Sequence, residues 1–171
     1  MNGLLIQLAS PEDLNDISQI EEICFPPAEA AKKEVIAKRL VAFKDSFFVA
    51  RLDNKIIGFV NGRATDSLVI HDELFYDAKP EDRVGENWCI FGLDVVPAYQ
   101  NRGIAAKLMA HFIEAAKKHH KKRVLLTCKE PLVPYYEKFG FVNDGLSNST
   151  HGGAEWYDMT LTFYTIRLFK L

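Results

Sequence analysis

The chain has 171 residues, of which 48% are hydrophobic and 26% charged, and its formal net charge is −2. This length and apolar content suit one compact domain rather than two, so we expect residues 1–171 to form a single domain. The small net charge argues against a dedicated nucleic-acid-binding protein, because such proteins carry a strong basic surface. We therefore expect a small-molecule partner.

The spacing of cysteines and histidines predicts neither a disulfide framework nor a metal site. Cys24, Cys89 and Cys128 are an odd number without Cys-x-x-Cys spacing, and the five histidines form no ligand pattern. We expect no metal and a reducing, cytoplasmic setting. No apolar run approaches the roughly 18 residues that a membrane span needs, so we expect no membrane contact. We expect a monomer or a homodimer.

The N-terminal part predicts one strand and two helices. The apolar run Leu4 to Leu8 predicts a strand, and Ser10-Pro11-Glu12-Asp13 is typical of a helix start. This helix should end near Cys24, because Phe25-Pro26-Pro27 cannot continue it. Apolar residues at helical spacing predict a second amphipathic helix from Ala28 to Phe43.

The middle of the chain predicts mostly strands. The β-rich runs Phe47 to Leu52 and Lys55 to Arg63 meet at Asp53-Asn54, a two-residue hairpin signal, so these strands should be antiparallel. Residues 65–86 show little periodicity, and we expect a long loop that covers the substrate. Trp88 to Val96 predicts a strand buried on both faces.

The C-terminal half alternates helices and strands. An apolar stripe from Ile104 to Ala115 predicts a long helix that stops at the basic cluster Lys117 to Arg123. Val124 to Cys128 predicts a strand, and Leu132 to Lys138 a short helix. The runs Phe141 to Leu146 and Glu155 to Phe163 predict two closing strands. No internal repeat or interdomain linker interrupts this pattern.

The segment between the buried strand and the long helix carries the strongest functional signal. It reads Gln100-Asn101-Arg102-Gly103-Ile104-Ala105. A helix that begins here points unpaired N–H groups and its positive dipole end at whatever lies in front, which suits a pyrophosphate. Gly103 allows close approach and Arg102 adds charge. The alternative is an ordinary turn in which the glycine only relieves strain.

This segment places a Gln-x-x-Gly-x-Ala motif between a strand and an amphipathic helix. The arrangement resembles the acetyl-CoA signature of the GNAT superfamily of acetyltransferases. A second segment, Leu125 to Phe141, resembles the arylalkylamine (serotonin) N-acetyltransferase branch in its Leu-Val-Pro-Tyr-Tyr-Glu-Lys-Phe-Gly-Phe run. The likeness covers about residues 88–145. It implies an α/β GNAT fold, with a mixed, mostly antiparallel central sheet of about seven strands flanked by four helices. The sheet should open between the strand that ends at Val96 and the strand Val124 to Cys128.

The resemblance also implies roles for individual residues. Acetyl-CoA should bind as co-substrate. Tyr136 takes the place of the general acid that protonates the departing thiolate, and we expect Tyr135 to be a packing aromatic. The cofactor contacts implied are the backbone of Leu93, Asp94 and Val95 for the pantetheine arm, and Gln100, Asn101, Arg102, Gly103, Ile104, Ala105 and Ala106 for the phosphates.

The proton acceptor cannot be carried over from the arylalkylamine branch. That branch has two histidines on the buried strand, where this chain has Cys89 and Phe91. A base is still needed, because an alkylamine with a pKa of roughly 10.4 is almost entirely protonated at neutral pH. The replacement candidates that we consider are His151 and Glu86, followed by His71 and Glu73.

We expect acetyl transfer to a small primary amine, aromatic or not, by direct attack in a ternary complex. Phe25, Phe91 and Thr127 are the expected substrate contacts, and Phe47, Trp88 and Trp156 are aromatic residues that fit either the pocket or the core. Two alternatives stay open. A shallow peptide-accepting groove would favour a protein lysine or N-terminal acetyltransferase, and bound CoA without turnover would indicate a non-catalytic acyl-CoA-binding module.

Overall fold

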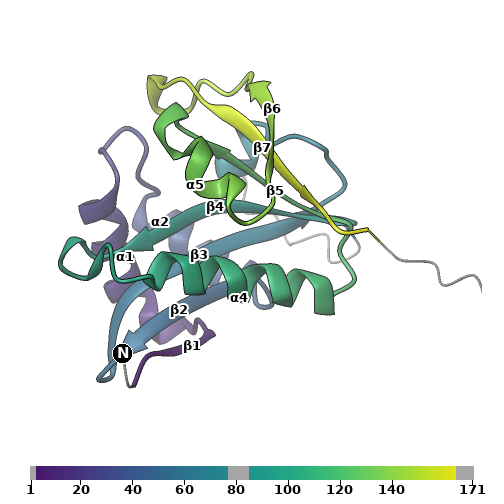
Figure 1. Cartoon of the computed structure of the whole chain (residues 1–171). Helices are drawn as coiled ribbons and strands as arrows, with labels where there is room; N and C mark the ends of the chain where they lie inside the picture. The colour runs from purple at the N-terminus through teal and green to yellow at the C-terminus, as the bar shows by residue number, and fades with distance from the viewer. Residues whose placement is uncertain (1–2, 77–84, 165–171) are drawn as a thin grey trace, which may run out of the picture.

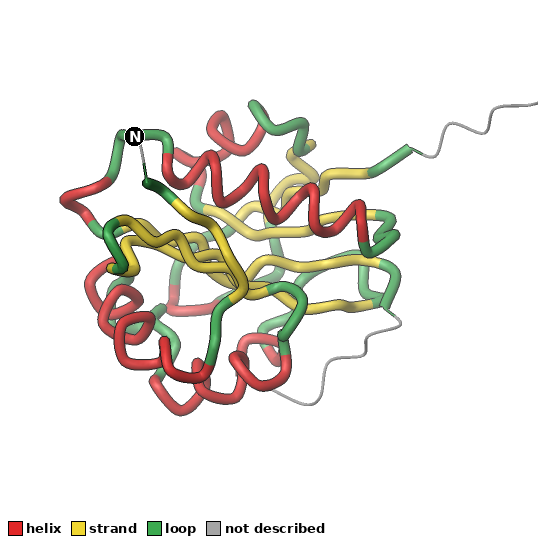
Figure 2. The backbone as a smooth tube through the Cα atoms, turned by 90° about the horizontal axis from the view of Figure 1, so that it is seen from below, coloured by secondary structure: helices red, strands yellow, loops and turns green. Residues whose placement is uncertain are grey.

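The computed structural model describes residues 3–76 and 85–164, which form one seven-stranded sheet with helices on both faces (Figures 1 and 2). The strand order is β1-β2-β3-β4-β5-β7-β6. All neighbouring strands pair antiparallel except β4 and β5, which are parallel. The strands are β1 (Leu5–Leu8), β2 (Phe47–Leu52), β3 (Lys55–Thr65), β4 (Asn87–Val95), β5 (Arg123–Cys128), β6 (Val142–Leu146) and β7 (Tyr157–Thr162). The expected mixed sheet and its opening are confirmed.

The helices form two layers, one on each side of the sheet (Figure 2). α4 covers one face, and α1 and α2 pack together on the other face. The helices are α1 (Leu14–Cys24), α2 (Lys33–Ala42), α3 (Glu73–Tyr76), α4 (Ile104–Lys118) and α5 (Val133–Glu137). In the described part of the chain, none of them is long and apolar enough to cross a bilayer.

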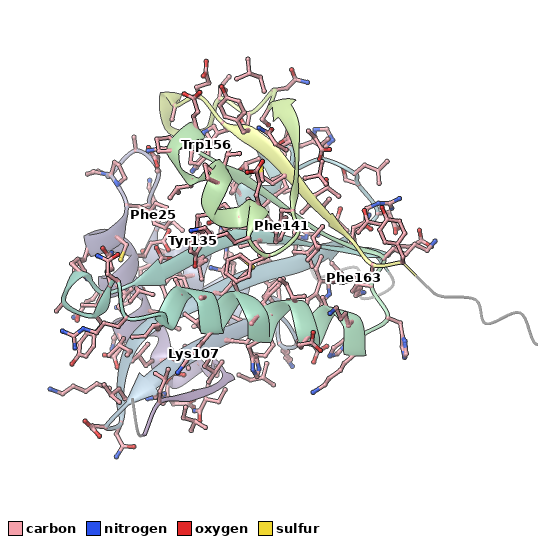
Figure 3. All side chains as sticks on the ribbon, in the orientation of Figure 1. Phe25, Lys107, Tyr135, Phe141, Trp156 and Phe163 are labelled. Carbon is pink, nitrogen blue, oxygen red and sulfur yellow. The ribbon has the colours of Figure 1, made fainter. Side chains whose placement is uncertain are left out.

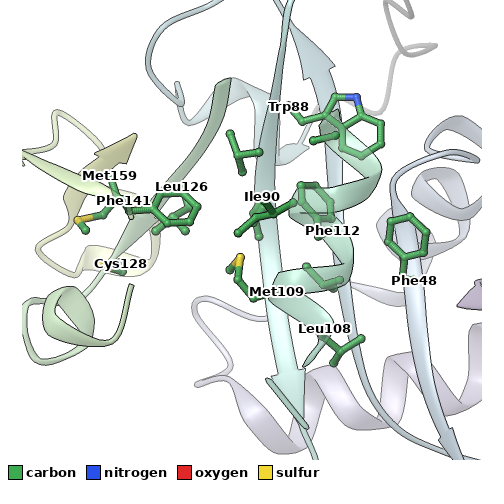
Figure 4. Packing of buried hydrophobic residues seen from close by; sticks show 14 of the residues in the cluster. Phe48, Trp88, Ile90, Leu108, Met109, Phe112, Leu126, Cys128, Phe141 and Met159 are labelled. Atoms are coloured by element: carbon green, nitrogen blue, oxygen red, sulfur yellow. The ribbon is translucent and has the colours of Figure 1, made fainter. Parts of the chain in front are cut away.

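Alternation along β2 divides the core between these two layers. Phe48 packs toward α4, whereas its neighbours Phe47 and Val49 pack toward α1 and α2, as expected because successive side chains point to opposite faces of a sheet. Figure 4 shows the cluster that includes α4, in which Phe112 lies beside Trp88. The apolar stripe on α4 therefore fixes this helix against the strands, and its N-terminus with it.

Two elements differ from the sequence-based expectation. The helix expected from Ala28 begins only at Lys33, and residues 25–32 form a loop, because Pro26 and Pro27 lack the amide hydrogens that a helix needs. The loop expected at 65–86 contains the single-turn helix α3, which brings the helix count in the described residues to five instead of four. Residues 77–84 of that loop lie outside the described residues.

Strands β4 and β5 diverge after a short paired stretch. They pair only from Asn87 with Arg123 to Cys89 with Leu125. Beyond this point the edge of β4 that faces β5 lacks a strand partner within the described structure. This divergence opens the sheet at the carboxyl ends of both strands.

A bulge in β4 lies at the same place. Asn61 of β3 pairs with Gly92, whereas the next residue, Gly62, pairs with Ile90, so Phe91 is the extra residue. After the bulge, Asn61 and Asp94 lie on the side of Gly92 where a side chain would project. A Cβ at Gly92 would be 3.1 Å from Asn61 Nδ2 and 3.2 Å from Asp94 Oδ2.

Candidate active site

A cavity of about 440 Å³ lies where β4 and β5 diverge. This volume is typical of a small-molecule site. Its walls come from both strands, from the loop 25–32, and from α1, α2 and α5. Six residues that the sequence predicted for the site line this cavity together: Phe25, Phe91, Leu93, Thr127, Tyr136 and His151.

The loop 25–32 forms a roof that is tied to the opposite half of the sheet. The carboxylate of Glu29 accepts a hydrogen bond from Lys129 Nζ at 2.7 Å, and its backbone carbonyl accepts one from His151 Nε2 at 3.1 Å. Gly152 has a positive φ of 63°, and a Cβ there would come within 2.4 Å of Glu29 Cγ. Glycine is therefore needed where the roof meets the turn after β6.

Aromatic rings build much of the cavity wall. The ring of Phe75 stacks on His151 at 4.6 Å and contacts Phe91 at 5.3 Å. Trp156 donates its indole N–H to the His151 carbonyl at 2.9 Å. Figure 3 labels Trp156 and Phe25, two of the residues that line the cavity. Phe47 and Trp88, the other aromatic candidates, are 2% and 1% exposed and belong to the core.

The predicted phosphate loop has the geometry of an anion site at the N-terminus of α4. Asn101 and Gly103 have φ values of 59° and 77°, and Gln100 Nε2 donates to the Val95 carbonyl at 2.9 Å, which fastens the loop to the end of β4. The amide of Lys107 donates to the Gly103 carbonyl at 3.1 Å. The amides of the preceding residues, Ile104, Ala105 and Ala106, therefore face the space in front of the helix.

Tyr136 reaches the cavity from α5, and its ring packs on Phe141 at 6.1 Å. Burial raises the pKa of its hydroxyl, and Cys128, Tyr135 and Asp94 raise it further. The phenol is therefore protonated at neutral pH and can donate a proton. Tyr135 packs on Phe139 at 5.3 Å, as a packing aromatic should.

The four candidate bases lie in three different places. His151 lines the cavity. Glu86 is exposed and forms an ion pair with Lys122, outside the lining of this cavity as the structure describes it. His71 and Glu73 line a separate cavity of about 220 Å³. The structure therefore brings one of the four candidates, His151, to the predicted active site.

A buried group of charged side chains borders the cavity, and sequence reasoning missed two of its members, Glu21 and Arg39. Both side chains line the cavity and are 4% exposed. Asp94 lies nearby at 3% exposure, and Asn61 at 1%. Arg39 donates to Asn61 Oδ1 at 3.4 Å and to the Phe75 carbonyl at 3.0 Å, and its guanidinium lies over the Phe91 ring at 4.9 Å.

The two carboxyl groups of this cluster hold protons more tightly than usual. Burial raises the pKa of Asp94 well above its ordinary 3.8, and the nearby Glu21 raises it further. Burial also raises the pKa of Glu21, against the hydrogen bond from Ala31 and the charge of Arg39, which lower it. Arg39 stays charged, because a guanidinium does not lose its proton in proteins.

A signal for Glu21 and Arg39 was present in the sequence. Glu21 occupies one position of the apolar stripe that Ile17, Ile20 and Cys24 define on α1, at spacing i, i+3, i+4, i+7. Arg39 interrupts the matching stripe of Ile36, Leu40 and Phe43 on α2 in the same way. A charge within a buried stripe on two adjacent helices marks a polar site inside the core.

The chain belongs to the acetyltransferase (GNAT) family, whose model matches residues 14–141. The Escherichia coli ribosomal-protein-S18-alanine N-acetyltransferase shares its fold, with a TM-score of 0.72 at 17% identity over 97% of this chain and 99% of that chain. No curated protein sequence matches the chain.

Two further solved structures share the fold. Naa50 from Arabidopsis thaliana, in complex with the bisubstrate analogue CoA-Ac-MVNAL, gives a TM-score of 0.73 at 16% identity over 94% and 99% of the two chains. The GphF GNAT-like decarboxylase in complex with isobutyryl-CoA gives 0.81 at 17% identity over 92% and 98%. At these identities the likeness establishes the fold.

Replacing Asp94 by Asn should change how stability depends on pH. An acid whose pKa is raised by folding contributes stability that is fully present below its ordinary pKa and is lost as the pH rises through the folded value. The free energy of unfolding of the wild type should therefore fall as the pH rises above about 4, and that of Asp94→Asn should fall less. At neutral pH the variant should be more stable by on the order of 1 kcal/mol.

Urea denaturation at several pH values measures this difference. Asp16→Asn, at an exposed carboxylate on α1, is the control and should follow the wild type. If the free energy of unfolding depends on pH in the same way in Asp94→Asn and in the wild type, the pKa of Asp94 is not raised.

Proposed function

We propose that this chain is an acetyl-CoA-dependent N-acetyltransferase that acetylates a small primary amine, aromatic or not, by direct attack in a ternary complex. The supporting observation is the roofed cavity between β4 and β5, which holds Tyr136 beside aromatic walls. Its volume of about 440 Å³ and its roof suit a small acceptor better than an open peptide groove.

The residues present fit acetyl-CoA as the co-substrate. A Cβ added at Gly103 would meet nothing within 4 Å, so the space before α4 is open to the pyrophosphate. The amides of Ile104, Ala105 and Ala106 would bind the phosphate oxygens, together with Arg102 and the loop residues Gln100 and Asn101. The edge of β4 at Leu93, Asp94 and Val95 has no strand partner on the β5 side in the described residues, and its free backbone groups would bind the pantetheine amides, as an added strand would.

Acetyl transfer requires two proton movements. The acceptor nitrogen must lose a proton before its lone pair can attack the thioester carbonyl, and the departing thiolate must gain one. Tyr136 suits the second step by position, because its phenol lines the cavity and is protonated at neutral pH. Among the bases named from sequence, His151 suits the first step by position.

The main alternative is a protein lysine or N-terminal acetyltransferase. In its favour, the similar Escherichia coli structure is an S18-alanine N-acetyltransferase, and the Naa50 complex holds a peptide-like bisubstrate analogue. Against it stands the roof over the cavity, which the contact between Glu29 and Lys129 joins to the opposite half of the sheet. A non-catalytic acyl-CoA-binding module is the second alternative.

The test is CoA release from acetyl-CoA with arylalkylamines, polyamines, amino acids, and peptides with a lysine or a free N-terminus. Turnover of a small amine with a kcat/KM well above that of every peptide supports the proposal. Preference for a peptide would support the protein acetyltransferase instead. Tight acetyl-CoA binding by calorimetry without any turnover would support the binding module.

Replacing Tyr136 by Phe should lower kcat about 100-fold, because the leaving thiolate loses its proton donor. Acetyl-CoA affinity should stay unchanged, since the ring remains. Tyr135→Phe is the matched control, because Tyr135 is the adjacent packing tyrosine, and it should keep the wild-type rate. Steady-state kinetics and calorimetry measure both effects. An unchanged rate in Tyr136→Phe would remove this residue from the mechanism.

Replacing Gly103 by Val should weaken acetyl-CoA binding roughly tenfold or more, because a β-branched residue resists a φ of 77° and would shift the loop. Gly145→Val is the matched control, since Gly145 has a φ of 104° and equally open surroundings but lies in β6. Calorimetric titration with acetyl-CoA should show the loss in Gly103→Val alone. Equal affinity in both variants would contradict the phosphate-loop assignment.

A further inference from the structure

The carboxylate of Glu21 is held in one orientation at the wall of the cavity. Its Oε1 accepts a hydrogen bond from the amide of Ala31 at 2.7 Å, and Ala31 belongs to the roof loop that lines the same cavity. Its other oxygen, Oε2, is buried and has no hydrogen-bond partner among residues 3–76 and 85–164. A buried carboxylate oxygen without a partner is costly, so this atom calls for a ligand.

The charges around Glu21 do not balance. Asp94 on β4 faces it with a second carboxyl group, whose Oδ2 is also buried without a partner in the described structure. Arg39 on α2 contributes one positive charge. Cys24 on α1 and Cys89 on β4 contribute none, because burial raises the pKa of these thiols to about 11 and about 12.

With both carboxyl groups ionised, Glu21, Asp94 and Arg39 together carry one net negative charge in a buried setting. Arg63 of β3 is a further cation that acts on Cys89, but it is not among the charges that shift the pKa of Glu21 or Asp94. One added proton neutralises the cluster of two carboxylates and Arg39, and so does one bound ammonium group. The cluster with a bound ammonium group is neutral, and so is the protonated cluster beside the neutral amine. A site of this kind should therefore bind a protonated amine and then take one proton from it.

We propose that Glu21 is the catalytic base, with Oε2 binding the ammonium group of the acceptor amine and removing one proton from it. The inference rests on the proposed acetyltransferase function and names the proton acceptor that the chain uses. Arg39 acts as a positioning residue, because its charge lowers the proton affinity that burial gives Glu21. Asp94 is the neighbouring carboxyl group, whose own pKa Glu21 raises.

The step balances in atoms and charge. One N–H bond of the ammonium group breaks, and its proton binds Glu21 Oε2. The freed lone pair forms the N–C bond to the acetyl carbonyl carbon, and the C–S bond breaks with its electron pair on sulfur. The sulfur takes a proton from Tyr136, and the second proton lost by nitrogen returns to Tyr136. Glu21 afterwards releases its proton to solvent.

Glu21 suits this step better than His151 does. His151 Nε2 is bonded to the Glu29 carbonyl at 3.1 Å, and the His151 ring is stacked on Phe75. This histidine is therefore part of the contact that joins the roof to the opposite half of the sheet. Glu21 Oε2 has a negative charge to offer a cation and no competing partner among the described residues.

The decisive variant is Glu21→Gln, which keeps the shape and the acceptor for the Ala31 amide but removes the base. The rate of acetylation of an alkylamine at neutral pH should fall about 100-fold or more. An acceptor of the aniline type, whose nitrogen is already neutral, should keep its rate within a few fold, because its first proton needs no removal. Glu22→Gln, at the adjacent exposed glutamate, is the matched control and should behave as the wild type.

The pH profile supplies a second readout. In the wild type, kcat/KM for the alkylamine should rise as the Glu21 and Asp94 pair loses its proton and then level off. In Glu21→Gln it should keep rising with the fraction of free amine. Glu21→Asp, which retains a carboxylate, should restore part of the rate and the wild-type shape of the profile, and it serves if Glu21→Gln does not fold.

The possible outcomes distinguish the role of Glu21 from the proposed acetyltransferase function. Loss of alkylamine turnover with retained aniline turnover supports the assignment of Glu21. A wild-type rate in Glu21→Gln overturns it, and so does an equal loss with both acceptors at unchanged acetyl-CoA affinity. A wild-type chain that acetylates no amine overturns the proposed function, and the role of Glu21 falls with it.

Discussion

Strands β4 and β5 pair over three residues and then diverge, and the rest of the site depends on this divergence. Backbone groups along an unpaired strand edge need partners, and a strand edge inside a domain is a ready binding surface for an extended amide chain. The bulge at Phe91 falls in the same stretch, so Gly92 and Asp94 lie on the side of the sheet that α1 and α2 cover. Under the proposed function, the edge of β4 would bind acetyl-CoA, and the side of β4 that faces α1 and α2 would lie toward the acceptor amine.

The apolar layers on the two faces hold this irregular strand in place. α4 is fixed by Ile104, Leu108 and Phe112, which are at most 1% exposed, and its N-terminus is thereby held at the end of β4. On the other face, α1 and α2 bring Glu21 and Arg39 into a largely apolar interior, beside Asp94 and Asn61. Such burial of charge costs stability. The core is therefore less stable than an apolar version would be. The same burial places the charged cluster at the wall of the cavity.

Regular elements could be predicted from sequence, because hydrophobic periodicity and turn residues act locally. The hairpin at Asp53 and Asn54, the buried strand ending at Val95 and the helix from Ile104 all lie within one or two residues of their expected bounds. The burial of Glu21 and Arg39 was not predicted, because a charged residue on an amphipathic helix usually faces solvent. Their burial depends on how α1 and α2 pack, and that packing joins residues far apart in sequence. Likewise, nothing local in the sequence indicated that Glu29 would contact Lys129, 100 positions later.

The three cysteines have a practical consequence for the study of this chain. A thiol reacts as its thiolate, and burial raises the pKa of Cys24 and Cys128 to about 11 and that of Cys89 to about 12. The thiol of free CoA is exposed to solvent rather than buried, so it lacks this shift and ionises more readily near neutral pH. A colorimetric thiol reagent added to the native protein should therefore report released CoA over a nearly silent background, and acetyl transfer can be followed continuously without a radioactive label.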